Sequence, residues 1–292
     1  MASNYVTKRV YTMQRITTII ISFNEEKNIS YAIDSVSGWT DVFVVDSGST
    51  DQTVQIAEAK GAKVVHHDFE NYAAQRNWAM NNDPHENAWI LFLDADEVLI
   101  DELKGEMLKV LEENTFDGFY INRRFYFMEK WIKYGGDYPT WILRLFRKGK
   151  GVVERDVNEH LKVLGKVGYL KHDFADNNRN GISAWINKHT KYADMEALEL
   201  FRYDQRKLEN RHDERAHFFG VQAERKRWIR EYIWNPLLPP LVRPFFYFFY
   251  CYFIKLGFLD GKAGFIYRVL QFWFYFLIDV KYLELKKKAN QK

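Results

Sequence analysis

Residues 88–98, AWILFLDADEV, decide how we expect this chain to fold. The six residues Ala88–Leu93 are uncharged and show no polar alternation, which is typical of a short strand buried on both faces of an α/β sheet. Ligands of open α/β sheets bind at the carboxyl ends of the strands. In extended backbone, residues i and i+2 point to the same side. The stretch therefore predicts that Asp94 and Asp96 present two carboxylates together at that edge.

Two neighbouring carboxylates suit a divalent cation. Beside a phosphate-bearing ligand they would bind Mg²⁺ or Mn²⁺, because these hard cations prefer oxygen ligands. The alternative is two solvated aspartates in a turn that follows a strand. The Asp-x-Asp triplet by itself does not separate these interpretations.

The residues around this stretch alternate between strand and helix patterns. We expect strands over 16–22, 41–46 and 62–66, and helices from residue 27 to about 37, over 51–60 and over 72–80. Ser49 or Thr50 is expected to cap the second helix, and Gly61 to end it. Repeated β–α units favour a mainly parallel sheet flanked by helices. The sequence therefore predicts the α/β class.

Polar residues recur at the ends of the expected strands. Asn24 and Glu25 follow the first strand, and Asp46 and Asp51 border the loop DSGSTD after the second. Parallel neighbours bring these ends to one edge of the sheet. Asp46 is placed to accept a hydrogen bond from a uracil N–H or a ribose hydroxyl, although the loop is also an ordinary turn between a strand and a helix.

Composition indicates a cytoplasmic protein with two dissimilar halves. Cys251 is the single cysteine of 292 residues, so no internal disulfide can form, and residues 1–15 are polar. Residues 1–122 hold 9 Lys/Arg against 20 Asp/Glu, whereas residues 123–292 hold 33 against 19. The acidic half suits a metal, and the basic half suits an anionic surface or acceptor.

The C-terminal part is rich in aromatic residues. Pro244–Ile254 and Phe265–Ile278 are apolar, but each is shorter than the roughly 20 apolar residues of a spanning helix. Both stretches have Lys and Arg nearby, which is typical of an anchor at an anionic membrane surface. The alternative is a hydrophobic subunit interface in a homo-oligomer.

Four motifs in order carry a family resemblance. SFNEEKNI (22–29), VVDSGSTDQT (44–53), QRNWA (75–79) and LDADE (93–97) resemble, in order and spacing, the motifs of family-2 glycosyltransferases of the GT-A fold. WILRLFRKGKG (141–151), VNEHL (157–161) and residues 257–276 resemble a bacterial subgroup that includes lipopolysaccharide-core β-glucosyltransferases. The resemblance covers roughly residues 16–285.

The resemblance implies a GT-A type, Rossmann-like sheet with a helical C-terminal extension. Residues 16–125 would bind a nucleotide sugar, 126–235 the acceptor, and 236–292 the membrane. The implied partners are a UDP-sugar donor and a lipid-linked glycan acceptor, with Mg²⁺ or Mn²⁺ as cofactor, and nucleic acid is not among them. Alternatives are transfer to a polyprenyl phosphate, and a nucleotide-sugar-binding membrane scaffold without turnover.

The resemblance also assigns roles to residues. In the donor site, Asp46 would bind the base, and Asn24, Glu25 and Asp51 would frame it. Arg76 and Asn77 would order the pocket. Asp94 would contact the ribose, and Asp96 would hold the metal. Glu159 falls where the family has its catalytic base, although this chain has Asn158 where many relatives have His. An acceptor hydroxyl needs such a base as it attacks, and a single displacement inverts the anomeric centre.

Three further side chains are candidates for the same site. Arg144 and Arg147 carry forked guanidiniums that suit phosphate, or else form structural ion pairs. His172 would be a metal or diphosphate ligand, as a late histidine is in some relatives of the fold. Its alternative is a hydrogen-bonded structural histidine.

Overall fold

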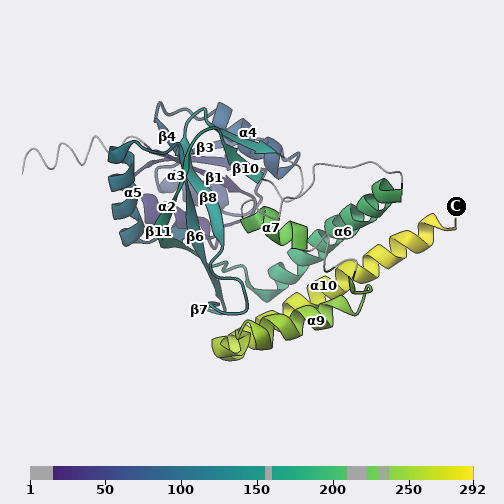
Figure 1. Cartoon of the computed structure of the whole chain (residues 1–292). Coiled ribbons are helices and arrows are strands. Elements are labelled where there is room, and N and C mark those ends of the chain that lie inside the picture. Colours follow the sequence, from purple (N-terminus) through teal and green to yellow (C-terminus); the bar gives the residue numbers. More distant parts are fainter. Residues whose placement is uncertain (1–15, 155–159, 209–221, 230–233, 235–236, 292) are drawn as a thin grey trace, which may run out of the picture. The chain divides into compact units, whose positions relative to one another are not determined.

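The computed structural model describes residues 16–154, 160–208, 222–229, 234 and 237–291 (Figure 1). The chain forms two compact units. The first consists of Met1–Tyr126 and Pro139–Asn180, and the second of Phe127–Tyr138 and Gly181–Lys292. The expected site residues all belong to the first unit.

The first unit is built on one mixed sheet. Its parallel half has the strand order β3 (Lys63–His66), β2 (Asp41–Asp46), β1 (Ile16–Ser22) and β4 (Trp89–Phe92). The sheet continues with β8 (Trp141–Arg147), β6 (Gly118–Phe127), β11 (Val167–Asp176) and β5 (Glu97–Leu99). Strand β8 runs antiparallel to both neighbours, β6 and β11 are parallel, and β5 is antiparallel to β11. The mainly parallel α/β prediction is confirmed.

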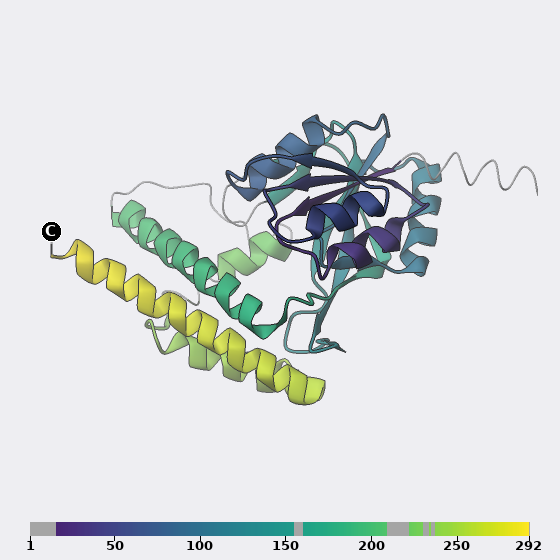
Figure 2. The same ribbon diagram turned by 180° about the vertical axis from the view of Figure 1, so that it is seen from behind.

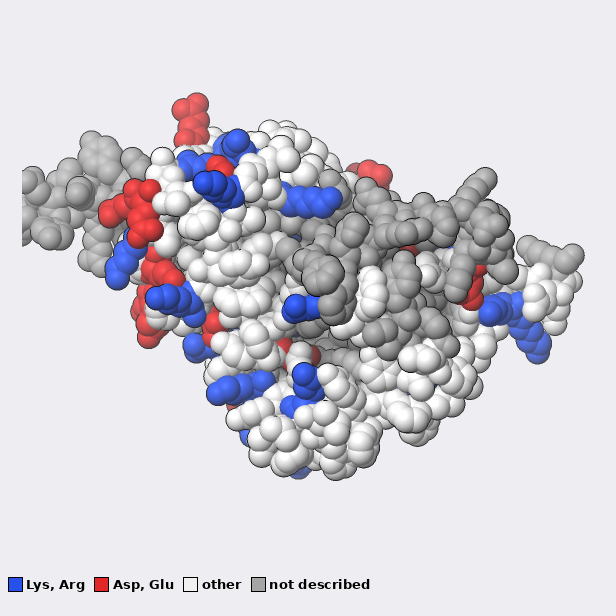
Figure 3. Space-filling model, viewed as in Figure 1, with Lys and Arg blue, Asp and Glu red and all other residues white. Residues whose placement is uncertain are grey.

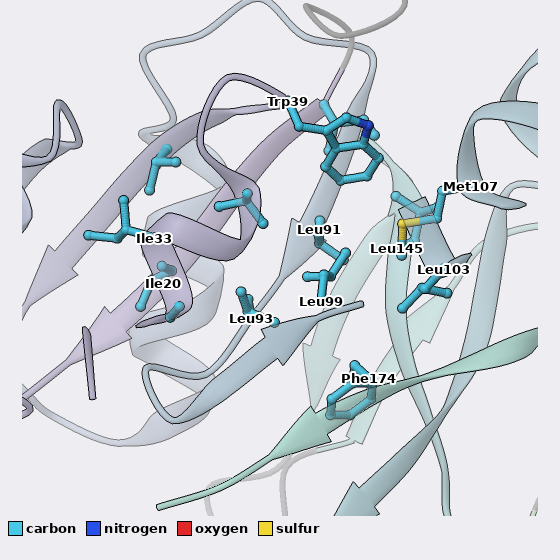
Figure 4. Packing of buried hydrophobic residues seen from close by; sticks show 14 of the residues in the cluster. Ile20, Ile33, Trp39, Leu91, Leu93, Leu99, Leu103, Met107, Leu145 and Phe174 are labelled. Atoms are coloured by element: carbon cyan, nitrogen blue, oxygen red, sulfur yellow. The ribbon is translucent and has the colours of Figure 1, made fainter. Parts of the chain in front are cut away.

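Helices cover both faces of this sheet because the central strands are apolar on both sides. On one face Ile20, Val44 and Leu91 pack with α2 (Ile29–Val36), α3 (Thr53–Ala59) and α5 (Asp101–Glu113). Figure 4 shows this cluster, with Leu103 and Met107 of α5 against Leu91, Leu99 and Leu145. On the other face Ile19 and Phe43 pack with α4 (Tyr72–Asn81). The absence of polar alternation thus reflects burial on both sides.

Most expected elements of this half form with small shifts, but the expected cap of α3 is wrong. The helix begins after Gln52, and no side chain caps it. The Ser49 hydroxyl donates to Asp46 instead, and the Thr50 amide donates to Asn24. A short antiparallel pair, β9 (Gly151–Glu154) and β10 (His160–Val163), completes the unit.

The second unit is mainly helical. It contains β7 (Lys130–Trp131), α6 (Gly181–Leu208), α7 (Gln222–Ile229), α9 (Arg243–Phe249), the π-helix η2 (Tyr250–Ile254), the 3₁₀ helix η3 (Gly257–Asp260) and α10 (Gly261–Ala289). Helices α6 and α10 lie side by side in both views (Figures 1 and 2), with Ala193 and Ala197 of α6 against Ile278 and Tyr282 of α10.

The second apolar stretch of the C-terminal part lies in a longer helix than the sequence pattern predicts, whereas the first coincides with α9 and η2. Residues 257–289 form one helical segment, and its length and composition are enough to cross a membrane. Only 28% of its most apolar window is buried. The second unit therefore carries a large exposed apolar surface on this segment.

Candidate active site

Asp46 holds the loop that follows β2. Its side chain is almost fully buried. Ser22 Oγ at the end of β1 donates to Oδ1 over 2.9 Å, and Ser49 Oγ donates to the same oxygen over 2.6 Å. The Gly48 and Ser49 amides donate to Oδ2 over 3.0 and 2.7 Å. Both carboxylate oxygens are thus engaged by the loop, so Asp46 determines the shape of the pocket wall.

Asn24 joins the loop after β1 to the loop after β2. Its backbone is in the left-handed region, with φ 55°. Its backbone amide donates to Ser49 Oγ, and its side-chain Oδ1 accepts a hydrogen bond from the Thr50 backbone amide, both at 2.8 Å. Asparagine tolerates this conformation better than most residues. The two loops therefore form one hydrogen-bonded wall at the carboxyl edge of the sheet.

Asp51 adds a second connection between the same loops. Its Oδ2 accepts a hydrogen bond from the Glu26 amide at 3.2 Å, and its Oδ1 accepts from the Thr53 amide at 3.0 Å. Burial raises the pKa of Asp51, but the hydrogen bonds from the Thr53 hydroxyl and from the Thr53 and Glu26 amides lower it by more, so its pKa lies below the ordinary value. Asp51 is therefore an ionised, structurally engaged carboxylate.

The DADE segment forms a turn, which corrects one expectation. The Glu97 amide donates to the Asp94 carbonyl oxygen at 2.9 Å, so residues 94–97 are not extended. Asp94 and Asp96 therefore do not share the alternation of a strand. The Asp96 carbonyl oxygen accepts from the Asn177 amide, and its Oδ2 accepts from Asn178 Nδ2 at 2.8 Å.

Asp94 lies between two arginines. Arg76 Nη2 donates to its Oδ1 at 2.9 Å, and Arg144 Nη2 donates to its Oδ2 at 2.7 Å. The Asp94 side chain is nevertheless 42% exposed, whereas the Arg144 side chain is 5% exposed. A buried cation thus fixes a carboxylate that still faces solvent, as a ligand contact requires.

Glu97 completes this cluster, and the sequence reasoning gave it no role. Its buried carboxylate accepts hydrogen bonds from Arg144 and from the Asp94 amide. Burial raises the pKa of Glu97 well above its ordinary value, because Arg144 only partly offsets it and Asp94 adds repulsion. Burial lowers the pKa of Arg144, but Asp94 and Glu97 raise it by more. Arg144 therefore stays charged and holds both carboxyl groups.

The loop after β11 brings in two more residues that sequence reasoning missed. Asn178 contacts Asp96 as described, and Asn180 Nδ2 donates to Glu25 Oε2 at 3.0 Å. Between them the Arg179 guanidinium lies over the Tyr31 ring, 3.8 Å from its centroid. The run DNNRNG predicts only a turn, because the partners of its amides lie far away in the sequence. The loop joins the ends of β1 and β4.

Asn77 supports a neighbouring strand. Its Nδ2 donates to the Val153 carbonyl oxygen at 2.9 Å, and its Oδ1 accepts from the Val153 amide at 3.0 Å. This paired contact fixes β9, which leads into residues 155–159. Glu159, the expected catalytic base, lies outside the described residues.

Two expected site residues are not brought to this cluster. Arg147 pairs in register with Trp89 at the start of β4, and its guanidinium lies 4.6 Å from the Trp89 ring centroid. Arg147 therefore lies at the amino end of β4, whereas Asp94 follows its carboxyl end. His172 Nδ1 contacts Glu106 Oε2 of α5 at 2.8 Å. The structure thus favours structural pairing for both side chains.

The donor set at Asp96 fits a hard divalent cation with few protein ligands. Among the described residues, no group of three or more His, Cys, Asp or Glu side chains could hold a metal. Mg²⁺ commonly binds through one or two carboxylates together with substrate phosphates and water. The oxygens of Asp96, beside the half-exposed Asp94, provide that kind of incomplete set.

Comparison with known proteins identifies the family. Residues 17–171 match the family described as glycosyl transferase family 2, so more than half of the chain is covered. The chain belongs to glycosyl transferase family 2. This result confirms the resemblance that the four motifs carry, and with it the GT-A type of fold.

Relatives span most of the chain. An uncharacterized glycosyltransferase of Rickettsia typhi is 28% identical over 296 residues, covering 95% of this chain and 90% of the relative. The lipopolysaccharide core biosynthesis glycosyltransferase LpsC of Rhizobium meliloti is 30% identical over 168 residues, covering 52% and 59%. Among solved structures, residues 1–349 of S. aureus TarS align over 95% of this chain and 92% of that chain at 16% identity, with a TM-score of 0.43.

Proposed function

We propose that this protein transfers a hexose, glucose being our first choice, from a UDP-sugar to a lipid-linked glycan with inversion. The proposed acceptor is a lipopolysaccharide core, and the product carries a β-linkage. The observation that carries the proposal is the cluster of Asp94, Arg144 and Glu97 beside Asp96, at the edge where the loops after β1 and β2 meet. Membership of a glycosyltransferase family supports transfer rather than a binding role.

The donor would lie along this edge. We propose that the wall formed by Asn24 and Asp46 receives the uracil, and that Asp94 accepts a hydrogen bond from the ribose. Backbone groups of the loops offer the direct contacts, since Asp46 itself is engaged by Ser22 and Ser49. Arg76 and Arg144 keep the Asp94 carboxylate in one orientation through their hydrogen bonds.

Asp96 would hold Mg²⁺ or Mn²⁺ together with the diphosphate. A bound cation neutralises the charge that develops on the leaving diphosphate. Asn178 keeps the Asp96 carboxylate in one orientation by its hydrogen bond at 2.8 Å. Holding a ligand carboxylate in this way improves metal binding by fixing its geometry.

Glu159 would take the proton of the attacking hydroxyl. An alcohol is a poor nucleophile at neutral pH, so a positioned carboxylate increases the rate. The Asn77 contact that fixes β9 lies just before the segment that carries Glu159. We propose this residue on the family resemblance of VNEHL.

The name of the relative LpsC supports the choice of acceptor. A lipid-linked acceptor is made at a membrane, and residues 236–292 are proposed as the segment that associates with it. We place the protein on the cytoplasmic face of the cytoplasmic membrane. The competing arrangement is a homo-oligomer in which residues 236–292 form the subunit interface.

The test is a screen of UDP-sugars for UDP release in the presence of core oligosaccharide lipids, with and without Mg²⁺ or Mn²⁺. The proposal expects release with one hexose donor that depends on both metal and acceptor. Donor binding without release for any donor would contradict it and would favour a scaffold. The Glu159→Gln variant tests the base: near-normal turnover would favour a phosphate acceptor that is already ionised.

A further inference from the structure

The surface of the second unit is unusually apolar over one segment. Residues 242–269 hold 12 of the 27 large hydrophobic side chains that are exposed among the described residues. We call these side chains the aromatic tip: Val242, Phe245, Phe246, Phe249, Tyr250, Phe253, Ile254, Leu256, Phe258, Leu259, Phe265 and Val269. Figure 3 shows this part of the unit as a largely white area. An exposed apolar patch of this kind marks a site of interaction.

Three charged side chains of the same unit are buried. Arg268 is 1% exposed, Asp260 2% and Asp279 1%. Arg268 donates to Asp137 and to the Tyr134 carbonyl oxygen. A helix in water normally exposes its charges and buries its apolar face. Here Arg268, Asp260 and Asp279 are buried while the apolar side chains of the aromatic tip are exposed.

Backbone contacts complete this inner polar layer. The Asp260 carboxylate accepts from the Lys133 and Tyr134 amides at 3.2 and 3.0 Å. Asp279 accepts from the Leu241 amide at 2.8 Å and from Arg243 Nε at 2.7 Å. Because each of these buried charges has partners inside the unit, none of the three opposes contact of the aromatic tip with hydrocarbon.

Lysines surround the aromatic tip. Lys130, Lys133, Lys255 and Lys262 are exposed around it, and Lys255 Nζ lies 5.5 Å from the Tyr250 ring centroid. Such lysines attract an anionic lipid surface and extend from the aromatic layer to the headgroups. A symmetric contact with a second copy would bring the same positive charges together. Charge therefore favours a bilayer over a second copy of the chain.

The second half of α10 does not fit a bilayer interior. Lys281 pairs with Asp194, and Lys286 pairs with Asp204 at 3.3 Å, both on the neighbouring α6. Charged pairs of two adjacent helices would have to leave water if α10 crossed the membrane. The second half of α10 thus pairs its lysines with α6, although it also exposes Val280 and Leu283.

We propose that the aromatic tip inserts into the boundary between headgroups and acyl chains of an anionic bilayer, with α10 lying at the surface and not crossing it. This inference rests on the proposed function in one respect, namely that a lipid-linked acceptor brings the protein to a membrane. It deepens that function by naming the partner surface and the side chains that enter it.

Vesicle flotation tests insertion, with phosphatidylcholine vesicles that do or do not contain phosphatidylglycerol. The wild type is expected to float with the anionic vesicles. Phe249→Ser with Phe253→Ser should weaken partitioning by about tenfold for each residue, because each exposes less apolar area to the lipid. Unchanged partitioning of this variant would overturn the proposal. Leu164→Ser, an exposed position of the first unit, is the matched control and should float normally.

The lysines are tested separately. Lys255→Gln with Lys262→Gln should reduce binding to anionic vesicles by about fivefold per lysine, with no change on phosphatidylcholine alone. Equal effects on both kinds of vesicle would contradict the electrostatic part of the proposal. Depth is measured with an environment-sensitive fluorophore on Phe253→Cys in a Cys251→Ser background. Its emission should shift to the blue on binding.

Two alternative outcomes would replace the proposal. If α10 spans, trypsin added outside sealed vesicles will fail to remove the Lys286–Lys288 tail. If the tip is a subunit interface, the wild type will sediment as a dimer without vesicles, and the Phe249/Phe253 variant as a monomer. UDP-sugar binding by these variants should be unchanged. A variant that loses vesicle binding but still binds UDP-sugar reports on the aromatic tip alone. A wild type that binds no UDP-sugar would contradict the proposed function and not the membrane contact.

Discussion

Asn178 and Asp96 lie 82 residues apart and are joined by a hydrogen bond of 2.8 Å from Nδ2 to Oδ2. If Asp96 holds the metal, Asn178 acts by orienting this ligand. We expect Asn178→Ala to raise the metal concentration for half-maximal activity at least about tenfold, with kcat at saturating metal nearly unchanged. The measurement is a metal titration of UDP release. Asn82→Ala removes an exposed amide that follows α4 and donates to the Trp78 carbonyl oxygen, and it should leave the titration unchanged.

Asp96 itself should be indispensable for turnover. Asp96→Asn removes the charge that holds the cation, so we expect kcat to fall by about 10³ or more. Chelation of the metal from the wild type should have the same effect and should be reversed by Mg²⁺ or Mn²⁺. Asp68→Asn changes an exposed aspartate of the same unit and is the control. Activity of Asp96→Asn within tenfold of the wild type would rule out its role as metal ligand.

Arg144 should contribute strongly to stability. Arg144→Leu leaves the buried Glu97 and the adjacent Asp94 without their shared cation. We expect the free energy of unfolding to fall by about 3 kcal/mol or more, since removing one partner leaves a buried polar group unpaired. Urea unfolding measures it. Arg147→Leu, three residues along β8 and more exposed, should cost less than about 1 kcal/mol. If both variants lose the same free energy of unfolding, the cluster around Arg144 contributes no more to stability than an exposed ion pair.

His189 should make stability depend on pH. Burial lowers the pKa of His189 from its ordinary value of 6.5, with Lys188 adding repulsion. Below that ordinary value the unfolded chain binds a proton that the folded state resists, so the free energy of unfolding falls as the pH drops from about 7 to about 5. His189→Phe retains a ring beside Trp185 and should flatten this dependence. An unaltered slope in urea unfolding would assign the pH effect to other groups.

The sequence predicts the parallel half of the sheet well because its signals are local. Apolar runs such as 16–22 and 41–46 coincide with β1 and β2. The sequence leaves a turn at 94–97 open as the alternative to an extended segment, and it does not predict that the Glu97 carboxylate accepts a hydrogen bond from the Asp94 amide there. Arg144 and Arg147 appear equivalent in the sequence. Only the antiparallel direction of β8 places the first near Asp94 and the second at the opposite edge.

The asparagine side chains that complete the site are a second feature that the sequence does not predict. Asn178 and Asn180 are turn residues in the sequence, and their partners Asp96 and Glu25 are chosen by the folded chain. Asp46 shows the reverse case. Its motif indicated a ligand contact, but a buried carboxylate must first satisfy its own hydrogen bonds, and the nearby loop amides do so.

The chain passes between its two units three times, after Tyr126, after Tyr138 and after Asn180. The segment Phe127–Tyr138 leaves the sheet unit and supplies Asp137 and the Tyr134 carbonyl oxygen to Arg268. A gene divided after residue 180 would therefore encode one product with the sheet unit and an orphaned loop, and a second product with a helical unit that lacks the acceptors of its buried arginine. Recombination could not exchange the helical unit for another by a single crossover, so the two parts are expected to be inherited together.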